Sequence, residues 1–396
     1  MKKFFSYFLM CALCATSLTF VSCGDSNNDT ELTGIDLLID QGVLYGKLDH
    51  DVTLDSDVTY TLTGTFSVED GATLTIPAGT RIEATEGYAS YIIVAQGGKI
   101  YINGTESNPV VMTADDEDNA SSGYWGGLIL NGKAPISGTT TGTTATCEMN
   151  SSYTYGGTDA ADNSGSITYL IQKYAGARSS ADVEHNGLTL DAVGTGTTIS
   201  NIFIYENADD GIECFGGTVN VSNVLVVNED DDMFDNTQGY TGTWTNFYGI
   251  WESGYTSTED DPRGIESDGN FDGKTPDDVG QTDFTVTNLT IDLKLDYADA
   301  AATTMMDVIK IRRGAKATIT NALVKGTGCV TDLIDCTDSK GDAAAGTNIS
   351  IYNNLTNAVT GTTISKVGEN SATLSTNTSS TGCSSSIFSW TGYSNF

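Results

Sequence analysis

The sequence predicts an all-β protein: a single-stranded parallel β-helix, which is a solenoid with coils of about 22 residues and a cap at each end. Two observations predict this fold. The stretch from Asn207 to Gly217 aligns without gaps with the stretch 22 residues later, and such a period is typical of stacked repeats. A motif of a β-branched residue, a polar residue, Asn and an apolar run also recurs, which favours strands over helices.

The N-terminal segment is expected to direct the protein out of the cell. In residues 1–22, Lys2 and Lys3 precede an apolar stretch that is too short for a stable membrane span, which is typical of a signal peptide. Cys23 follows Ser22 as at a bacterial lipoprotein cleavage site; ordinary signal cleavage is the alternative. Lipidation of Cys23, with palmitate among several acyl chains, would anchor the protein firmly in the outer membrane, exposed at the cell surface.

The remaining chain divides by its pattern. Residues 23–35 are polar and are expected to form a tether, and residues 36–63 an N-terminal cap that blocks edge pairing. Alternating apolar and polar residues with glycine turns predict the β-helix over residues 64–340. Residues 341–396 are expected to form the last coils and a cap. The residues expected to close that far end are Ile387, Phe388, Trp390 and Phe396.

One stretch inside the β-helix is ambiguous. Residues 296–311 are expected to hold either one short helix or a long loop.

The asparagine of the repeated motif has a physical explanation. Asn tolerates the left-handed backbone that a sharp turn between short strands needs, and stacked asparagines can hydrogen-bond along the axis as a ladder. We expect this ladder to contain Asn201, Asn223, Asn288 and Asn321. Four unrelated surface asparagines are the alternative.

The net charge of −34 limits the partners. It argues against nucleic acid and against direct adhesion to anionic lipid, so contact with the membrane is expected through the lipid anchor only. It favours cations and partners that are neutral or basic.

The cysteines after the signal are odd in number, so at least one is expected to be unpaired. Cys329 and Cys336 are close enough in sequence to pair across a short loop. A zinc site is not expected, because no CxxC spacing occurs and only His50 and His185 are present. The five cysteines are Cys147, Cys214, Cys329, Cys336 and Cys383.

Several motifs between Gly64 and Asn321 resemble a family of secreted or surface β-helix lipoproteins of Bacteroidetes-type bacteria. They include "GATLTIPAGTRI", "YWGGLILNGKAP", "NADDGIECFGGTVNVSNVLV", "NEDDDMFDNTQGYTG" and "IRRGAKATITN". The resemblance implies a right-handed parallel β-helix at the cell surface. It implies no settled enzymatic activity.

The acidic residues of the repeat predict a site. Ile212 and Phe234 should point into the core, so Glu213 and Asp235 should point outward on neighbouring coils about 4.8 Å apart. Asp209 and Asp231 share their outward parity. By contrast, Asp210 and Asp232 have inward parity but sit at the bend, where they are expected to be structural and to accept backbone N–H bonds.

Calcium binding is the first possible function of these acids, because hard cations bind several carboxylate and carbonyl oxygens. A second calcium candidate is the segment "DGNFDG", in which Asp268, Asn270 and Asp272 alternate as at the start of an EF-hand loop. The terminal bidentate acid of such a loop is absent, since Val279 stands at the twelfth position. A solvated acidic loop is the alternative.

Catalysis is the second possible function. A polysaccharide lyase or glycoside hydrolase on the acidic face would use Glu213, Asp235, Asp231 and Arg312, and coil spacing suits a retaining pair of carboxyl groups about 5–5.5 Å apart. However, outward acids at this spacing arise in any acidic solenoid, and a fold does not carry a function.

Binding is the interpretation that we favour at this stage. Trp244, Tyr248 and Trp251 follow the acidic coils, and aromatic rings beside carboxylates are suited to gripping sugar rings. With Asp209, Glu213, Asp231 and Asp235 they form the expected binding surface. We therefore expect a monomeric surface lipoprotein that binds extracellular glycan or another host or cell-surface ligand without catalysis, supported by calcium. A purely structural envelope protein is a further alternative.

Overall fold

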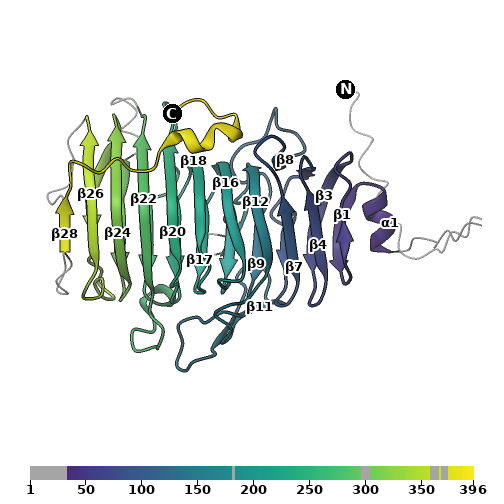
Figure 1. Ribbon diagram of the computed structural model, residues 1–396, viewed down its shortest axis with the longest axis horizontal. Coiled ribbons are helices and arrows are strands. Elements are labelled where there is room, and N and C mark those ends of the chain that lie inside the picture. The colour runs from purple at the N-terminus through teal and green to yellow at the C-terminus, as the bar shows by residue number, and fades with distance from the viewer. Residues whose placement is uncertain (1–33, 181–182, 296–303, 357–364, 367–372) are drawn as a thin grey trace, which may run out of the picture.

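The protein is a parallel β-helix in the computed structural model (Figure 1), which describes residues 34–180, 183–295, 304–356, 365–366 and 373–396. Its principal sheet contains 24 strands, and the pairs within it are parallel. The predicted signal, lipidation site and most of the tether lie outside the described residues. Among the described residues, no helix has the length and apolar character needed to cross a bilayer.

The helices and strands follow one another along the coil. The described helices are α1 (Ile35–Asp40), η1 (Phe271–Gly273) and η3 (Ser385–Thr391). The strands are β1 (Val43–Leu48), β2 (Val52–Thr53), β3 (Thr59–Val68), β4 (Thr73–Pro77), β5 (Arg81–Ala84), β6 (Ile92–Val94), β7 (Lys99–Asn103), β8 (Val110–Ala114), β9 (Leu128–Asn131), β10 (Thr144–Thr146), β11 (Thr154–Gly156), β12 (Gly165–Lys173), β13 (Arg178–Ser180), β14 (Val183–Glu184), β15 (Leu188–Asp191), β16 (Thr198–Asn207), β17 (Ile212–Phe215), β18 (Val221–Glu229), β19 (Phe234–Thr237), β20 (Thr243–Trp251), β21 (Arg263–Asp268), β22 (Asp283–Leu293), β23 (Thr304–Arg312), β24 (Lys316–Gly326), β25 (Cys329–Asp335), β26 (Asn348–Leu355), β27 (Ser365–Lys366) and β28 (Thr373–Thr376).

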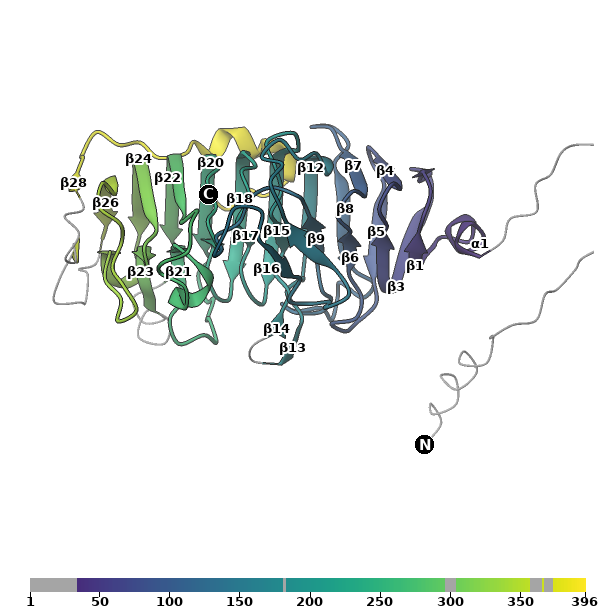
Figure 2. The same cartoon turned by 90° about the horizontal axis from the view of Figure 1, so that it is seen from below.

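Two stacks of strands run along the axis. The first stack contains the long strands β12, β16, β18, β20, β22, β24, β26 and β28. The second stack contains β9, β15, β17, β19, β21, β23, β25 and β27, and several of its strands are labelled in Figure 2. Each coil thus contributes one strand to each stack.

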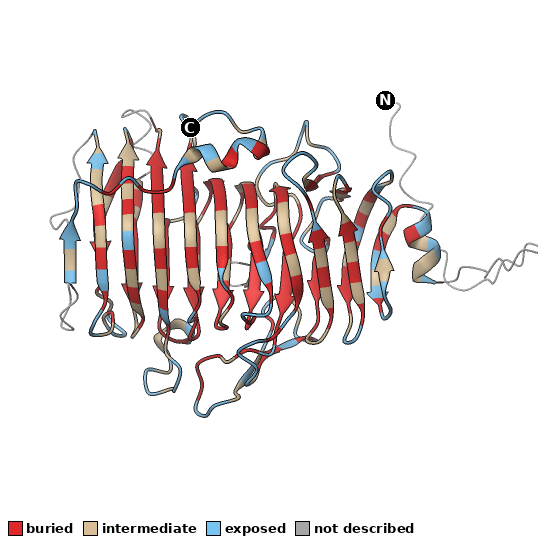
Figure 3. Cartoon of the chain, viewed as in Figure 1, coloured by how far each residue is buried: buried red, intermediate tan, exposed pale blue. Residues whose placement is uncertain are grey.

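The core fills the inside of the coil. Along strands such as β4 and β7, buried residues alternate with partly exposed ones, as the two-residue period of a strand requires, whereas β9, β15 and β21 are buried at every position (Figure 3). In the second stack, Ile212, Phe234 and Ile265 lie in register and are fully buried. Burial of such a continuous apolar column is the main source of stability in a solenoid.

The asparagine ladder is confirmed and is longer than predicted. Asn201, Asn223, Asn246, Asn288 and Asn321 have positive φ angles between 53° and 62°. From Asn223 onward, each side-chain amide donates to the side-chain oxygen of the preceding asparagine, over 2.7–3.0 Å. The ladder therefore fixes the register of the first stack across five coils. Asn246 belongs to it although the sequence comparison omitted it.

Three features of the fold differ from those expected. Parallel pairing already begins with β1 and β3, so the chain before residue 64 contributes coils, and among the described residues α1 precedes them. The ambiguous stretch is a strand from Thr304 onward, because Met305 and Ile309 enter the core; residues 296–303 lie outside the described part. Cys329 and Cys336 are buried free thiols, so the suggested disulfide is wrong.

The residues expected to close the far end lie elsewhere. Residues 380–396, here called the strap, run back along the side of the coil and cross the first stack near β18 (Figure 1). There Phe388 and Trp390 pack against an outward-facing apolar row that includes Phe203, Leu225 and Tyr248. The strap takes this place because the row would otherwise expose large apolar side chains to water.

Candidate functional site

The second stack carries a column of acidic side chains on its outer face. Glu213, Asp235 and Glu266 occupy equivalent positions on β17, β19 and β21. They point outward because their neighbours along each strand, such as Ile212 and Phe234, fill the core. The predicted proximity of Glu213 and Asp235 is therefore confirmed. The next residue of the column is Lys310, which ends the run of like charges.

The double aspartates lie in the loops that lead into these strands. Asp209 and Asp210 precede β17, and Asp231 and Asp232 precede β19. Carboxylate oxygens of Asp209, Asp210 and Asp231 lie within 4.8 Å of one another. The loops and the column therefore bring two rows of acids to one place.

Together these residues line an open cleft with a volume of about 250 Å³, here called the acidic cleft. Eleven of its lining residues are acidic and two are arginines. The acidic residues are Glu148, Glu184, Asp209, Asp210, Glu213, Asp231, Asp232, Asp235, Glu266, Asp268 and Asp272. Such a concentration of one charge strongly favours a cationic occupant.

The expected division between structural and outward acids is only partly correct. Oδ1 of Asp210 accepts a hydrogen bond from the backbone N–H of Asp232 at 3.0 Å, as a structural residue should. Yet carboxylate oxygens of Asp210, Glu213 and Asp235 also lie within 4.8 Å of one another. Asp209, predicted to face outward, is 92% buried, since its side chain is only 8% exposed in the cleft wall.

Some acceptors of the cleft lack a hydrogen-bond donor. Asn186 donates to Oε2 of Glu213 at 2.6 Å. In contrast, one carboxylate oxygen each of Asp231, Asp232 and Asp235 is buried without a hydrogen-bond partner among the described residues. Burying such an oxygen without a partner is costly, so these atoms are available to a cation.

Burial and repulsion between neighbouring carboxylates both raise the pKa of these carboxyl groups. Burial, followed by the charge of neighbouring acids, raises the pKa of Glu213 and of Asp210 well above the ordinary range. The same two causes raise the pKa of Asp235. Burial and the charge of Glu266 raise the pKa of Asp231 to about 7. Without a cation, part of the cleft therefore holds protons near neutral pH.

Arginines neutralise acids only at the margins of the cleft; at one margin, Nη1 of Arg178 lies 3.1 Å from Oε1 of Glu184. Arg312 pairs with Glu266 and, at 2.6 Å, with Asp268, and Arg263 approaches Glu266 to 2.7 Å. Among the described residues, no Lys or Arg forms an ion pair with Asp210 or Glu213 or with the other unneutralised acids, Asp209, Asp231 and Asp235. The excess of negative charge is therefore concentrated over β17 and β19.

The donor set fits a hard divalent cation. It consists of carboxylate oxygens without His or Cys ligands, and calcium binds six to eight oxygens of this kind. Asp210, Glu213 and Asp235 are the residues that would hold the ion. One oxygen of Asp235 is buried without a hydrogen-bond partner among the described residues, so it could coordinate such an ion.

The residues of the predicted calcium loop, Asp268, Asn270 and Asp272, are engaged by other side chains and by the backbone. The two oxygens of Asp268 each contact an arginine at 2.6 Å, from Arg312 and Arg313. Asp272 pairs with Arg313 at 2.7 Å, and Asn270 is fully buried, where its Oδ1 accepts the backbone N–H of Thr275. Basic side chains thus contact the carboxylates that the sequence predicted to bind a cation.

The prediction of an exposed aromatic surface is wrong. Trp244 and Trp251 are fully buried inside the coil, where Trp244 stacks on Phe247 with ring centroids 5.1 Å apart. Tyr248 points outward but lies beneath the strap, and its hydroxyl donates to Asp292 at 3.1 Å. None of the three rings can stack on a ligand in this structure.

Glu266 is the residue of the acidic column that sequence comparison missed, and Glu148 and Glu184 of the cleft were missed as well. The signal was present, because Gly264-Ile265-Glu266 repeats Gly211-Ile212-Glu213. A long loop between β20 and β21 breaks the regular spacing and hides the match.

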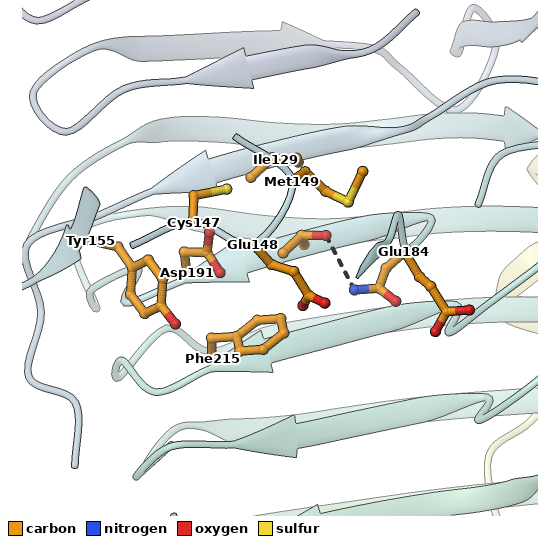
Figure 4. Close-up of a pocket in the computed structure, with 10 residues that line it drawn as sticks. Ile129, Cys147, Glu148, Met149, Tyr155, Glu184, Asp191 and Phe215 are labelled. Atoms are coloured by element: carbon orange, nitrogen blue, oxygen red, sulfur yellow. Dashed lines mark hydrogen bonds between the residues drawn. The ribbon is translucent and has the colours of Figure 1, made fainter. Parts of the chain in front are cut away.

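A small cavity of about 10 Å³ adjoins the cleft and shares Glu148, Glu184 and Phe215 with it (Figure 4). The Cys147 thiol lies beside the carboxyl group of Asp191, whose pKa is raised to about 8 by burial. Asp191 therefore keeps its proton at neutral pH. This space holds about one water molecule, so it is too small for a larger ligand.

Fold and cleft together define a parallel β-helix with a charged outer face. The family model described as a pectate-lyase-like β-helix domain matches residues 46–393, so the chain belongs to that family. Membership fits a carbohydrate-related role. Comparisons with curated proteins and with solved structures give no match.

Proposed function

We propose that the protein binds an acidic extracellular polysaccharide, without catalysis, through a calcium ion held in the acidic cleft. The observation that carries the proposal is the approach of Asp210, Glu213 and Asp235, whose carboxylate oxygens lie within 4.8 Å of one another without an ion-paired Lys or Arg among the described residues. A cation bound there has coordination positions left for the carboxylate and hydroxyl oxygens of a sugar. Direct contact between this cleft and an acidic sugar would be repulsive.

The state of the charged groups supports binding rather than lyase chemistry. A lyase base must lose a proton before it can accept one, and Arg312 is held between Glu266 and Asp268. These acids raise the pKa of Arg312 even though burial opposes them. Arg312 therefore stays charged and serves to neutralise the end of the cleft.

A glycoside hydrolase is the second candidate. Glu213 and Asp235 are outward neighbours on adjacent coils, which suits a retaining pair. Such an enzyme needs one protonated and one ionised carboxyl group. A calcium ion between the two would ionise both, so calcium-dependent binding and hydrolysis make opposite demands on this pair.

The test is isothermal titration calorimetry with acidic oligosaccharides, in calcium and in excess chelator, together with an assay for new reducing ends or unsaturated products. We expect binding in calcium only and no product. Asp235→Asn should abolish binding, whereas Asp57→Asn, at an exposed position near the N-terminal end, should not. Product that disappears in Glu213→Gln would instead establish the hydrolase. Absence of both binding and product would leave a structural envelope protein.

We also propose that a lipid on Cys23 holds the protein at the outer membrane, with the β-helix exposed at the cell surface. The polar segment between Cys23 and α1 supports this, because it gives the folded domain reach from the membrane. Labelling with a palmitate analogue should mark the wild-type protein and fail in Cys23→Ala. Surface proteolysis of intact cells should degrade the wild type; full protection would overturn the surface location.

A further inference from the structure

A second depression lies beside the acidic cleft. It is an open groove of about 650 Å³, here called the Tyr88 groove, with both polar and apolar lining. The ring of Tyr88 is 53% exposed there, which makes it one of the few large exposed apolar side chains among the described residues. An exposed aromatic ring in a concave polar setting is suited to stacking against a sugar ring.

The groove and the cleft share one wall. In the loop before β17, Ala208 lines the groove and Asp209 lines the cleft. In the loop before β19, Asp230 lines the groove and Asp231 lines the cleft. The cleft and the groove therefore lie on opposite sides of the same two loops.

An ion pair joins the two sites. Arg178 lines the groove, and its Nη1 lies 3.1 Å from Oε1 of Glu184, which lines the cleft. Nη2 of Arg178 donates to the backbone oxygen of Ala208 at 2.6 Å. These contacts tie the β13–β14 hairpin to the shared wall.

Tyr88 is held in place by its backbone and not by its ring. Nε2 of His185 donates to the carbonyl oxygen of Tyr88 at 2.9 Å. Burial lowers the pKa of His185 to about 4, so the imidazole is neutral and keeps this contact at neutral pH. The backbone of Tyr88 is thus fixed at the groove, so less conformational entropy is lost when a ligand stacks on the exposed ring.

We infer that one pyranose ring of the bound polysaccharide stacks on Tyr88, while a nearby acidic unit of the same chain is held through the cation in the acidic cleft. The inference rests on the proposed function and adds to it. The ligand class is a polysaccharide that presents both a carboxylate for the cation and a ring face for the tyrosine. A single acidic sugar fills the cleft only, and a longer oligosaccharide fills both sites.

The experiment measures affinity against chain length. Uronic acid oligosaccharides of one to six units, in galacturonate and mannuronate series, are titrated in calcium and in excess chelator. For Tyr88→Ala we expect unchanged affinity for the single unit and about tenfold weaker binding of the six-unit chain. Tyr88→Phe should bind as the wild type does, because it keeps the ring face. Tyr45→Ala removes another tyrosine of equal exposure, on β1, and should have no effect.

The outcomes separate this inference from the proposed function. If Tyr88→Ala binds the six-unit chain as tightly as the wild type, the Tyr88 groove is not a sugar site, and the calcium site stands as long as chelator abolishes binding. If binding survives chelator and Asp235→Asn, the calcium function fails, and the inference of a chain that joins both sites fails with it. If no oligosaccharide of either series binds in calcium, both are overturned.

Discussion

The backbone N–H of Asp232 donates to Oδ1 of Asp210 at 3.0 Å, so the double aspartate of one coil holds the equivalent loop of the next. Asp210→Ala removes the acceptor and leaves a buried N–H unsatisfied, and we expect it to lower the free energy of unfolding by about 1–3 kcal/mol. Asp210→Asn keeps an acceptor oxygen and loses a repelling charge. In chelator it should be at least as stable as the wild type in urea unfolding; equal losses in both variants would contradict this account.

Calcium should stabilise the folded protein, because the unfolded chain does not present the carboxylates together. At a calcium concentration 100 times the Kd, the expected gain is about 2.7 kcal/mol. Differential scanning fluorimetry should show a higher Tm in calcium and a smaller change in magnesium, which requires stricter octahedral geometry. Asp235→Asn should remove most of this response and Asp57→Asn none. An equal response in both variants would place the ion elsewhere.

Without calcium, the cleft should make the protein less stable as pH rises from about 4 to about 7. The pKa of Asp231 is raised from 3.8 to about 7 in the folded state, so the folded protein binds more protons than the unfolded chain in this window. Stability is therefore lost as pH rises through the folded pKa. His185 acts in the opposite direction, since its lowered pKa of about 4 costs stability as pH falls below 6.5.

The two effects can be separated by comparison with Asp231→Asn. His185 contributes equally to both proteins, so the difference in Tm between them reports on Asp231. In chelator, the wild type should lose stability relative to the variant as pH rises toward 7. A difference that stays constant over this range would contradict the raised pKa.

The asparagine ladder should contribute measurably to stability. Asn246 takes part in two of its hydrogen bonds, at 2.8 and 2.7 Å, and has a φ angle of 62°. Asn246→Gly removes the bonds and keeps the left-handed turn, at about 0.5–1.5 kcal/mol for each bond. Asn246→Ala adds the left-handed backbone penalty of about 1–2 kcal/mol. Urea midpoints should fall in the order wild type, Gly and Ala; the reverse order of the variants would refute the turn requirement.

The stacked fold and part of the cleft follow from local sequence. A gapless repeat places Glu213 beside Asp235 because parallel strands in register bring equivalent residues together. Glu266 belongs to the same column, yet the intervening loop changes the spacing in sequence without changing the register in space. For the acidic column, regular spacing therefore identified only the two coils that have no insertion between them.

The failed expectations concern contacts between distant parts of the chain. The outward parity of Tyr248 is a local property, but its exposure depends on Phe388 in the strap. Likewise, the alternating acids from Asp268 onward resemble a calcium loop until Arg313, from a later coil, is placed against them. Repeats predict where a side chain points, and they do not predict what covers it.

The strap also has a consequence for the order of events during synthesis. The strap covers Phe203 and Leu225, but its residue Phe388 is synthesised much later than they are. At about 5–20 residues per second, the ribosome needs roughly 10–40 s to cover that interval. Any coil that forms before residues 380–396 are in place carries a bare apolar strip, which is prone to aggregation until the strap covers it.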